Sequence, residues 1–350
     1  MPLGVRYRHW LMARQGVTFA TRAVRRRLGV DGTVYVWHRT DEYRRFWEEA
    51  SRMIGGTFTE LAPGLWEVGR NGRHTRIHIS MLQFNDQVVA SISANKAFAY
   101  QVAQANGVPV PEHRLFSLDE LSRARESLVR NPGVYVVKPA DNTSAGIGVT
   151  TFVRTPSQLS KAAILASLFN PEFIVERMVA GESCRLLFID GELAHGVRRR
   201  GIRLTGDGHS PIGQLAASQG AELDAIATWT LTAQGLDAGT VPGDGVEVLA
   251  RVLPPETSRV RELRTVYDED ITGLVSPSLV DEVRPVMEHL ETRLAGVDVV
   301  TTDPSRPLAE SGGVMLEVNP QPGIHHHYIT EQDHRTHPIA VRLLEKLLAG

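Results

Sequence analysis

The sequence predicts a mixed α/β (α+β) protein of two or three lobes, on the basis of three observations. Strand-like and helix-like segments alternate along most of the chain, which is the pattern of α/β architectures. The chain has 350 residues and is 42% apolar, enough to bury a large core. No internal repeat or low-complexity tract interrupts the alternation.

Residues 1–93 are expected to form a small N-terminal α/β domain. Arginines crowd residues 22–27, and the basic run passes directly into a strand-like segment at 33–37. We interpret it as an Arg-rich surface helix, with a basic anchor or a transit peptide as the alternatives. An amphipathic helix is predicted from Asp41 to about Ile54.

Residues 94–180 are predicted to form a second unit, and residues 181–350 a third. One helix of the second unit begins near Asn95 and stops before Gly107. Another begins at Ser117, which has a glutamate three residues later, as in a capping box. Strands are expected at 134–137, 149–153 and 173–175, with a helix from about residue 156, whereas residues 235–264 have the composition of a long loop.

Composition and charge exclude several classes of function. A formal net charge of -2 gives no general attraction to nucleic acid or to an anionic membrane. No apolar run approaches the roughly 18 residues that cross a bilayer. The single cysteine, Cys184, cannot form an internal disulfide, so a reducing cytoplasm is the expected location. Cys184 has no CxxC partner or flanking histidine, and we interpret it as a core residue rather than a nucleophile.

Lysine is rare in this chain, and its positions are informative. Of 38 basic residues only four are lysines: Lys96, Lys138, Lys161 and Lys346. A compact ammonium differs from a guanidinium in shape and reach, and one use for it is contact with a phosphate oxygen. This observation draws attention to Lys96 and Lys138.

A lysine and a Gly-rich loop follow the strand at 134–137. Lys138 ends the strand, and the loop to Gly148 includes Asn142, Ser144 and Gly146. Backbone N–H groups and hydroxyls of such a loop can surround phosphate oxygens while the lysine supplies charge. The loop is neither a Walker A motif nor a Rossmann fingerprint, because its glycines precede a strand. An ordinary hairpin with a surface lysine remains the alternative.

Three oxygen-bearing side chains interrupt two apolar strands near the C-terminus. They are Asp298, Glu317 and Asn319. A carboxylate in such a run is costly to bury unless it is paired or bound to a metal. Glu317 and Asn319 are two residues apart and share a strand face, so the set predicts an Mg²⁺ site. A strand whose polar side faces water is the alternative.

Other clusters are less decisive. Glu176 closes an apolar strand, and Met178 and Val179 after it could cover an adenine. The arginines at 198–200 suit either a phosphoryl group or a solvated edge. The histidines at 325–327 cannot all face one metal if the segment is extended, and one or two of them are expected to line the substrate end of the site.

Together these segments resemble the ATP-grasp superfamily, above all the ATP-grasp domain of cyanophycin synthetases. The resemblance runs from about residue 95 to 328, with a gap at about 216–265, and is most specific at 295–323, with its Gly-Val-Asp-Val-Val and Glu-Val-Asn-Pro motifs. The ATP-grasp domain of bifunctional glutathione-forming enzymes is similar as well. The resemblance implies an ATP-grasp fold preceded by a pre-ATP-grasp domain at 1–93, with 94–180 as the small lid subdomain.

The resemblance also implies roles for individual residues. Lys96 and Lys138 would contact ATP phosphates, and the loop with Asn142, Ser144, Gly146 and Gly148 would close over them. Glu176, Met178 and the backbone at Val179 would hold adenine. Arg199 and Arg251 would face the transferred phosphoryl group. The metal, Mg²⁺ or Mn²⁺, would be held by Asp298, Glu317 and Asn319, with Asp303 competing for the place of the first ligand.

The implied activity is ATP-dependent joining of a carboxylate to an amine through an acyl-phosphate, with amino acids or small peptides as substrates. Two alternatives are a ligase that modifies a protein or peptide terminus and a non-catalytic nucleotide-binding module. The likeness does not extend to the Mur-ligase-like half of cyanophycin synthetase, so polymer synthesis is not expected. ATP-grasp ligases are often dimers, which leaves a homodimer open.

Overall fold

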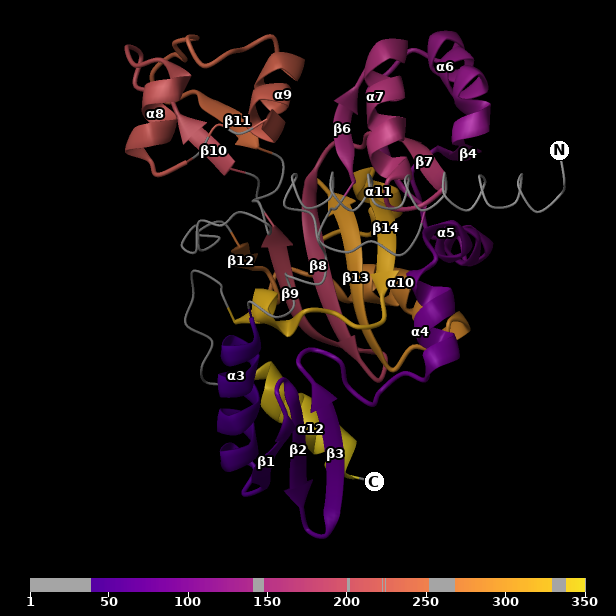
Figure 1. The fold of residues 1–350 in the computed structure, drawn as a ribbon, viewed down its shortest axis with the longest axis vertical. Coiled ribbons are helices and arrows are strands. Elements are labelled where there is room, and N and C mark those ends of the chain that lie inside the picture. Colours follow the sequence, from indigo (N-terminus) through magenta and orange to yellow (C-terminus); the bar gives the residue numbers. More distant parts are fainter. Residues whose placement is uncertain are drawn as a thin grey trace, which may run out of the picture.

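The computed structural model describes residues 39–140, 148–199, 202–221, 223, 225–251, 268–328 and 338–349. The expected strand at 33–37 and the Arg-rich segment before it lie outside these residues. The described elements form an elongated arrangement, with a five-stranded sheet between a unit containing α3 and α12 at one end and two smaller units at the other (Figure 1).

The first unit is a helix packed on a three-stranded antiparallel sheet. Asp41 and Glu42 favour the start of α3 through the helix dipole, and Tyr43, Trp47 and Ala50 recur at helical spacing on its buried face. The helix predicted at 41–54 is confirmed as α3. The elements are α3 (Thr40–Met53), β1 (Thr57–Ala62), β2 (Leu65–Arg70) and β3 (Arg73–His78), with strand order β1-β2-β3.

The C-terminal helix α12 (Ile339–Ala349) belongs to the core of this first unit. Leu343 and Leu344 of α12 pack with Trp47 and Trp66, all of them fully buried. Figure 1 shows α12 beside β2 and β3, although these strands are far from α12 in the sequence. The two ends of the described chain therefore stabilise each other, while the domain boundaries expected from the sequence stay predictions.

A four-stranded antiparallel sheet covered by two helices forms the small subdomain. Its strand order is β4-β7-β5-β6. The predicted capping box is confirmed: Ser117 and Glu120 close it at the start of η1. The elements are β4 (His113–Ser117), η1 (Leu118–Glu120), α6 (Leu121–Arg130), β5 (Tyr135–Pro139), β6 (Thr150–Val153), α7 (Pro156–Ser167) and β7 (Glu172–Arg177).

The central sheet has five antiparallel strands in the order β12-β9-β8-β13-β14. Helices α5 and α10 bury apolar side chains against one face, among them Val102 and Val283. Leu187 and Leu294 on the other face join the core of the first unit. The elements are α4 (Gln87–Ala94), α5 (Lys96–Ala105), β8 (Glu182–Ile189), β9 (Glu192–Arg199), β12 (Asp268–Asp270), α10 (Pro277–His289), β13 (Leu294–Thr301), α11 (Leu308–Ser311), β14 (Val314–Asn319) and η2 (Ile324–His327).

Cys184 lies inside the core of the central sheet, as predicted. Its side chain is buried against Leu186, Val299 and their neighbours. Burial raises the pKa of the thiol to about 12, so the reactive thiolate is scarce at neutral pH.

A small separate unit forms between β9 and β12 in the chain. It comprises β10 (Ile202–Thr205), α8 (Ile212–Ser218), α9 (Ala225–Ala233) and β11 (Glu247–Arg251), with β10 and β11 paired antiparallel. The prediction of a long loop at 235–264 is wrong at β11, because alternate residues Val248 and Ala250 are buried against Leu204 and Leu231. Within the described ranges, no helix combines the length and apolar character needed to span a bilayer.

We expect Trp47→Ala to lower the free energy of unfolding by about 3–5 kcal/mol, because it removes a fully buried ring. It also removes the hydrogen bond that Nε1 donates to the carbonyl oxygen of Ile79 at 2.8 Å. Urea unfolding measures the change, and Met53→Ala on the same helix, 53% exposed, is the control. Equal stability of the two variants would contradict the packing of α3.

Candidate active site

Two carboxylates meet in the middle of the central sheet. Asp298 on β13 lies directly opposite Glu317 on β14 in the antiparallel register. Asp298 is 8% exposed, and its neighbours Val297 and Val299 are fully buried on the opposite face. A β-bulge follows Asp298, at the point where the pairing with β14 shifts. The sheet therefore holds two hard oxygen donors side by side at the edge of a buried surface.

Arg185 on β8 neutralises Asp298, and the sequence analysis missed it. Its Nε donates to Oδ1 and its second guanidinium nitrogen to Oδ2 of Asp298, both at 2.7 Å. Burial alone would raise the pKa of Asp298, but Arg185, with help from Arg199, holds that pKa below its ordinary value. Asp298 is thus kept ionised. The sequence did carry a signal for Arg185: it is an arginine among the apolar residues of β8, and a buried charge requires a partner.

Gly296 lies between this ion pair and the loop after β14. A Cβ atom at residue 296 would lie 2.9 Å from Cβ of Pro322, and 3.7 Å from Cδ of Arg185. A larger residue would therefore displace Pro322 in the loop after β14, whereas its distance to Arg185 would be an ordinary van der Waals contact. The same guanidinium is 3.9 Å from Oε1 of Glu317, so one arginine serves both carboxylates.

Lys96 belongs to the carboxylate cluster rather than to the small subdomain. It is the first residue of α5 and is 7% exposed. Its Nζ lies 3.4 Å from Oε2 of Glu317. The side chain of Asn95 caps the helix by accepting a hydrogen bond from the backbone N–H of Phe98. This cap fixes where the helix begins and therefore the position of Lys96 in its first turn.

Lys138 and Glu176 form a second buried ion pair, on neighbouring strands of the small subdomain. Nζ of Lys138 lies 2.8 Å from Oε2 of Glu176. Both side chains contact the hydroxyl of Tyr100, one turn after Lys96 on α5, and the sequence analysis missed this residue. The spacing of four residues from Lys96 was the only signal for it. Helix α5 therefore contacts both charged clusters.

The rest of the expected nucleotide site is partly described. Asn142, Ser144 and Gly146 lie outside the described residues. Gly148 has a left-handed φ of 75°, and a Cβ there would lie 2.8 Å from both Phe169 and Pro139, so glycine is required. Met178 and Val179 follow β7 half-buried, and the backbone N–H of Met178 donates to the carbonyl oxygen of Val134.

The other two predicted metal ligands are engaged locally. Asp303 lies in the loop after β13, where its Oδ1 accepts from the backbone N–H and the hydroxyl of Ser305. Oδ1 of Asn319 accepts from the backbone N–H of Gln321 at 3.0 Å. Of the two candidates for the first ligand, the one that faces Glu317 is Asp298.

Arg199 ends β9 and is 8% exposed. It is near enough to lower the pKa of Asp298 and of His326, which places it at the cluster. Arg251 is the last residue of β11, and its side chain is outside the described part of the chain.

The histidines at 325–327 are all buried in η2, which packs against β9. The expectation of an extended segment is wrong, because these residues form a 3-10 turn. Figure 1 shows this yellow segment crossing from β14 towards β9. Tyr43 of the first unit contacts Nδ1 of His325 at 2.8 Å, and Nδ1 of His327 lies 3.1 Å from Nδ1 of His195. Burial lowers the pKa of His326 and His327 well below the usual range, so both are neutral at physiological pH.

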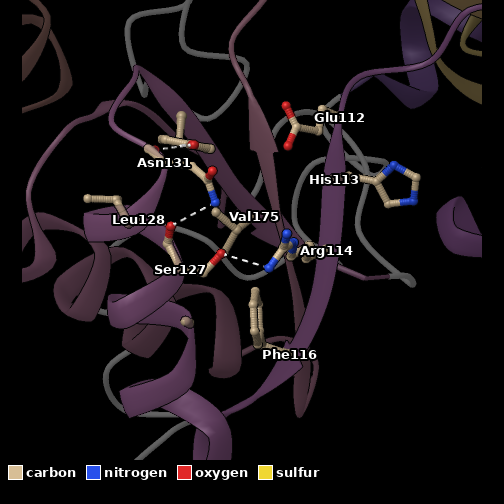
Figure 2. A pocket seen from close by; sticks show the side chains of 10 residues that line it. Glu112, His113, Arg114, Phe116, Ser127, Leu128, Asn131 and Val175 are labelled. Atoms are coloured by element: carbon tan, nitrogen blue, oxygen red, sulfur yellow. Dashed lines mark hydrogen bonds between the residues drawn. The ribbon is translucent and has the colours of Figure 1, made fainter.

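The small subdomain has a pocket that is separate from the cluster formed by Asp298, Glu317, Arg185 and Lys96. It lies between β4 and α6, and its lining includes Arg114, Ser127 and Asn131 (Figure 2). Arg114 donates to the hydroxyl of Ser127 across it. Among the predicted site residues that the structure describes, none lines this pocket.

The donor chemistry of the cluster fits a metal-bound triphosphate. Two carboxylate oxygens and an amide are ligands that Mg²⁺ accepts, and lysine and arginine cations surround them. Within the described ranges, no group of three or more His, Cys, Asp or Glu side chains is arranged to hold a metal. The predicted ligands Asp298 and Glu317 are thus two carboxylates in register on neighbouring strands.

Several known proteins are similar to this chain in sequence or in fold. No protein-family model matches the sequence. The chain is 28% identical over 284 residues to cyanophycin synthetase from Trichormus variabilis, covering 77% of this chain and 30% of that protein. It is 24% identical over 260 residues to the glutathione biosynthesis bifunctional protein GshAB from Clostridium perfringens, covering 69% of this chain and 32% of that protein. The chain thus spans about a third of the length of these relatives.

Among solved structures, a bifunctional glutathione synthetase from Pasteurella multocida superposes with a TM-score of 0.53 at 19% identity. The match covers 84% of this chain and 41% of that one. This chain has the ATP-grasp fold. The ATP-grasp resemblance and fold class predicted from the sequence are confirmed. In the ATP-grasp framework, the central sheet carries the carboxylates and the small subdomain carries Lys138 and Glu176.

We expect Arg185→Met to lower the free energy of unfolding by about 3–5 kcal/mol at neutral pH, since it removes the bidentate partner of the buried Asp298 carboxylate. The double variant Arg185→Met/Asp298→Leu should recover most of that loss, because no unpaired charge remains. Urea unfolding of the single and the double variant measures both changes. Equal destabilisation in both would show that the pair contributes through packing alone.

The ion pair also predicts a specific acid sensitivity. Because the pKa of Asp298 is lower in the folded protein than its unfolded value of about 3.9, its stabilising contribution is complete above that pH. The contribution is lost as the pH falls through the lower, folded pKa. The double variant should therefore lose less stability than the wild type between about pH 5 and pH 2, as measured by urea unfolding. Parallel curves for the two proteins would contradict a depressed pKa for Asp298.

Proposed function

We propose that this chain is an ATP-dependent carboxylate–amine ligase that forms an amide bond through an acyl-phosphate. The observation that carries the proposal is the register of Asp298 opposite Glu317, with Arg185 and Lys96 on those carboxylates. Two anions and two cations in one buried place suit a triphosphate and its divalent cation better than any nucleophilic chemistry. The substrates would be amino acids or small peptides.

The nucleotide would lie between the small subdomain and the central sheet. Lys138 would contact its phosphates, Glu176 and the backbone at Val179 would hold its adenosine part, and the loop from Asn142 to Gly148 would cover it. Support comes from the burial of Lys138 and Glu176, at 6% and 4% exposure, where few solvent molecules compete with a ligand.

Asp298, Glu317 and Asn319 would hold Mg²⁺ or Mn²⁺. When bound, the ion would supply charge neutralisation to the β- and γ-phosphates. Arg185 and Lys96, which contact Asp298 and Glu317, would supply positive charge to the phosphate oxygens. Arg199 would stabilise the transferred phosphoryl group from the end of β9.

The reaction would proceed in two steps. A substrate carboxylate oxygen attacks the γ-phosphorus, and ADP leaves. The amine then attacks the acyl carbon: the C–N bond forms, the acyl C–O bond breaks with its electron pair leaving on phosphate, and the nitrogen releases a proton to phosphate or solvent. No protein nucleophile is needed, in keeping with the core position of Cys184. Water must be excluded between the steps, because an acyl-phosphate hydrolyses.

The named relatives favour this class of reaction. Cyanophycin synthetase and the glutathione biosynthesis proteins take their names from products built by amide bonds. We place the reaction in the cytoplasm, where ATP is abundant and a single buried thiol stays reduced.

We expect the purified protein to release ADP from MgATP with at least one pair of proteinogenic amino acids, or with an amino acid and a short peptide. A coupled ADP assay over all pairs, with mass spectrometry of the product, measures this. Glu317→Gln should lower turnover by about 10²-fold or more, because it removes one anionic metal ligand.

The matched control for that variant is Glu310→Gln. Glu310 is also ion-paired, to Arg306 at 3.2 Å, but is exposed and away from the cluster. Its activity should equal that of the wild type. ATP binding without ADP release for any pair would instead favour a non-catalytic nucleotide-binding module, and full activity of Glu317→Gln would refute the metal assignment.

A further inference from the structure

Tyr100 is a fully buried tyrosine on α5 with no role in the site as described above. It is 0% exposed. Its ring lies 4.6 Å from that of His113 on β4, and Nζ of Lys138 is 5.2 Å from its centroid. Packing alone would account for a buried ring of this size, but the Tyr100 hydroxyl also forms hydrogen bonds with two charged side chains.

The hydroxyl closes a triangle with the nucleotide-side ion pair. Nζ of Lys138 donates to the Tyr100 oxygen at 2.8 Å, and the hydroxyl donates to Oε2 of Glu176 at 2.9 Å. Lys138 also contacts that same Oε2 at 2.8 Å. Both of these contacts of the carboxylate therefore fall on one oxygen, Oε2.

The Tyr100 hydroxyl can stabilise the buried Glu176 carboxylate when a ligand draws Lys138 away. If a nucleotide draws the Lys138 ammonium to a phosphate, Glu176 loses its counter-ion while still buried, which is costly. The Tyr100 hydroxyl can keep donating to Glu176 and keep accepting from Lys138 as they separate. Burial, followed by the nearby charge of Glu176, raises the pKa of Tyr100 well above its usual value, so the hydroxyl keeps its proton at physiological pH.

We propose that Tyr100 is a positioning residue for a purine nucleoside triphosphate, an inference that rests on the proposed function. Its hydroxyl sets the Lys138 ammonium for a phosphate oxygen and turns Oε1 of Glu176 towards a hydroxyl or amino donor of the nucleoside. The residue acts through these two side chains.

One face of helix α5 then contacts both charged clusters, through two different residues. Lys96 and Tyr100 are four residues apart and so lie one turn from each other. Lys96 contacts Glu317 in the central sheet, and Tyr100 contacts Glu176 in the small subdomain. The sequence-based assignment gave the phosphate-side role on this helix to Lys96, whereas the contacts point to Tyr100 for the nucleotide side.

Tyr100→Phe tests this inference, because it removes one oxygen and keeps the ring. Titration of the full-length protein with MgATP should show a rise of about tenfold or more in Kd, as expected for the loss of hydrogen bonds to charged groups. The KM for ATP should rise by a similar factor, with smaller changes in the KM values of the other substrates. Tyr135→Phe is the matched control, since it deletes a hydroxyl that donates to the carbonyl oxygen of Asn131 in the same subdomain. It should bind MgATP like the wild type.

A double-mutant cycle with Glu176→Gln separates positioning from packing. If Tyr100 acts through Glu176, its substitution should weaken ATP binding far less in the Glu176→Gln background. Additive effects, wild-type affinity in Tyr100→Phe, or an unfolding temperature far below that of Tyr135→Phe would each overturn the inference. If the wild type itself fails to bind MgATP, the proposed function fails first, which is a different result from a wild type that binds and a variant that binds equally well.

Discussion

The ion pair between Arg185 and Asp298 constrains the middle of the central sheet. A bidentate guanidinium–carboxylate contact at 2.7 Å fixes both side chains in direction as well as distance. Asp298 lies in register with Glu317, which in turn contacts Lys96. Because Asp298 and Arg185 are both buried, removing either one leaves the other charge without its bidentate partner.

Charge balance extends from this pair to the small subdomain. Lys96 forms an ion pair with Glu317 and Lys138 forms one with Glu176, so these cations contact anions of the protein itself. Binding of a metal-bound triphosphate would exchange partners within the set rather than create contacts from nothing. Metal and nucleotide binding should therefore favour each other, because each ligand frees groups that the other uses. Helix α5 joins the two halves of this network through Lys96 and Tyr100.

The sequence predicted the elements whose patterns are local. The 3.6-residue periodicity of α3 and the capping box at Ser117 needed no tertiary information. Asp298 and Glu317 were found because carboxylates are conspicuous in apolar strands. Arg185 and Tyr100 were missed because their importance depends on partners 113 and 76 residues away in the chain. The register that brings β8, β13 and β14 together is decided by burial over the whole sheet, which no single segment encodes.

A structure of the protein with Mg²⁺ and a non-hydrolysable ATP analogue tests the central claim most directly. The account predicts oxygens of Asp298 and Glu317 at about 2.0–2.1 Å from the ion. It also predicts Nζ of Lys138 within hydrogen-bonding distance of a phosphate oxygen. A nucleotide bound elsewhere, with Arg185 still bidentate on Asp298 and no ion beside Glu317, would contradict it.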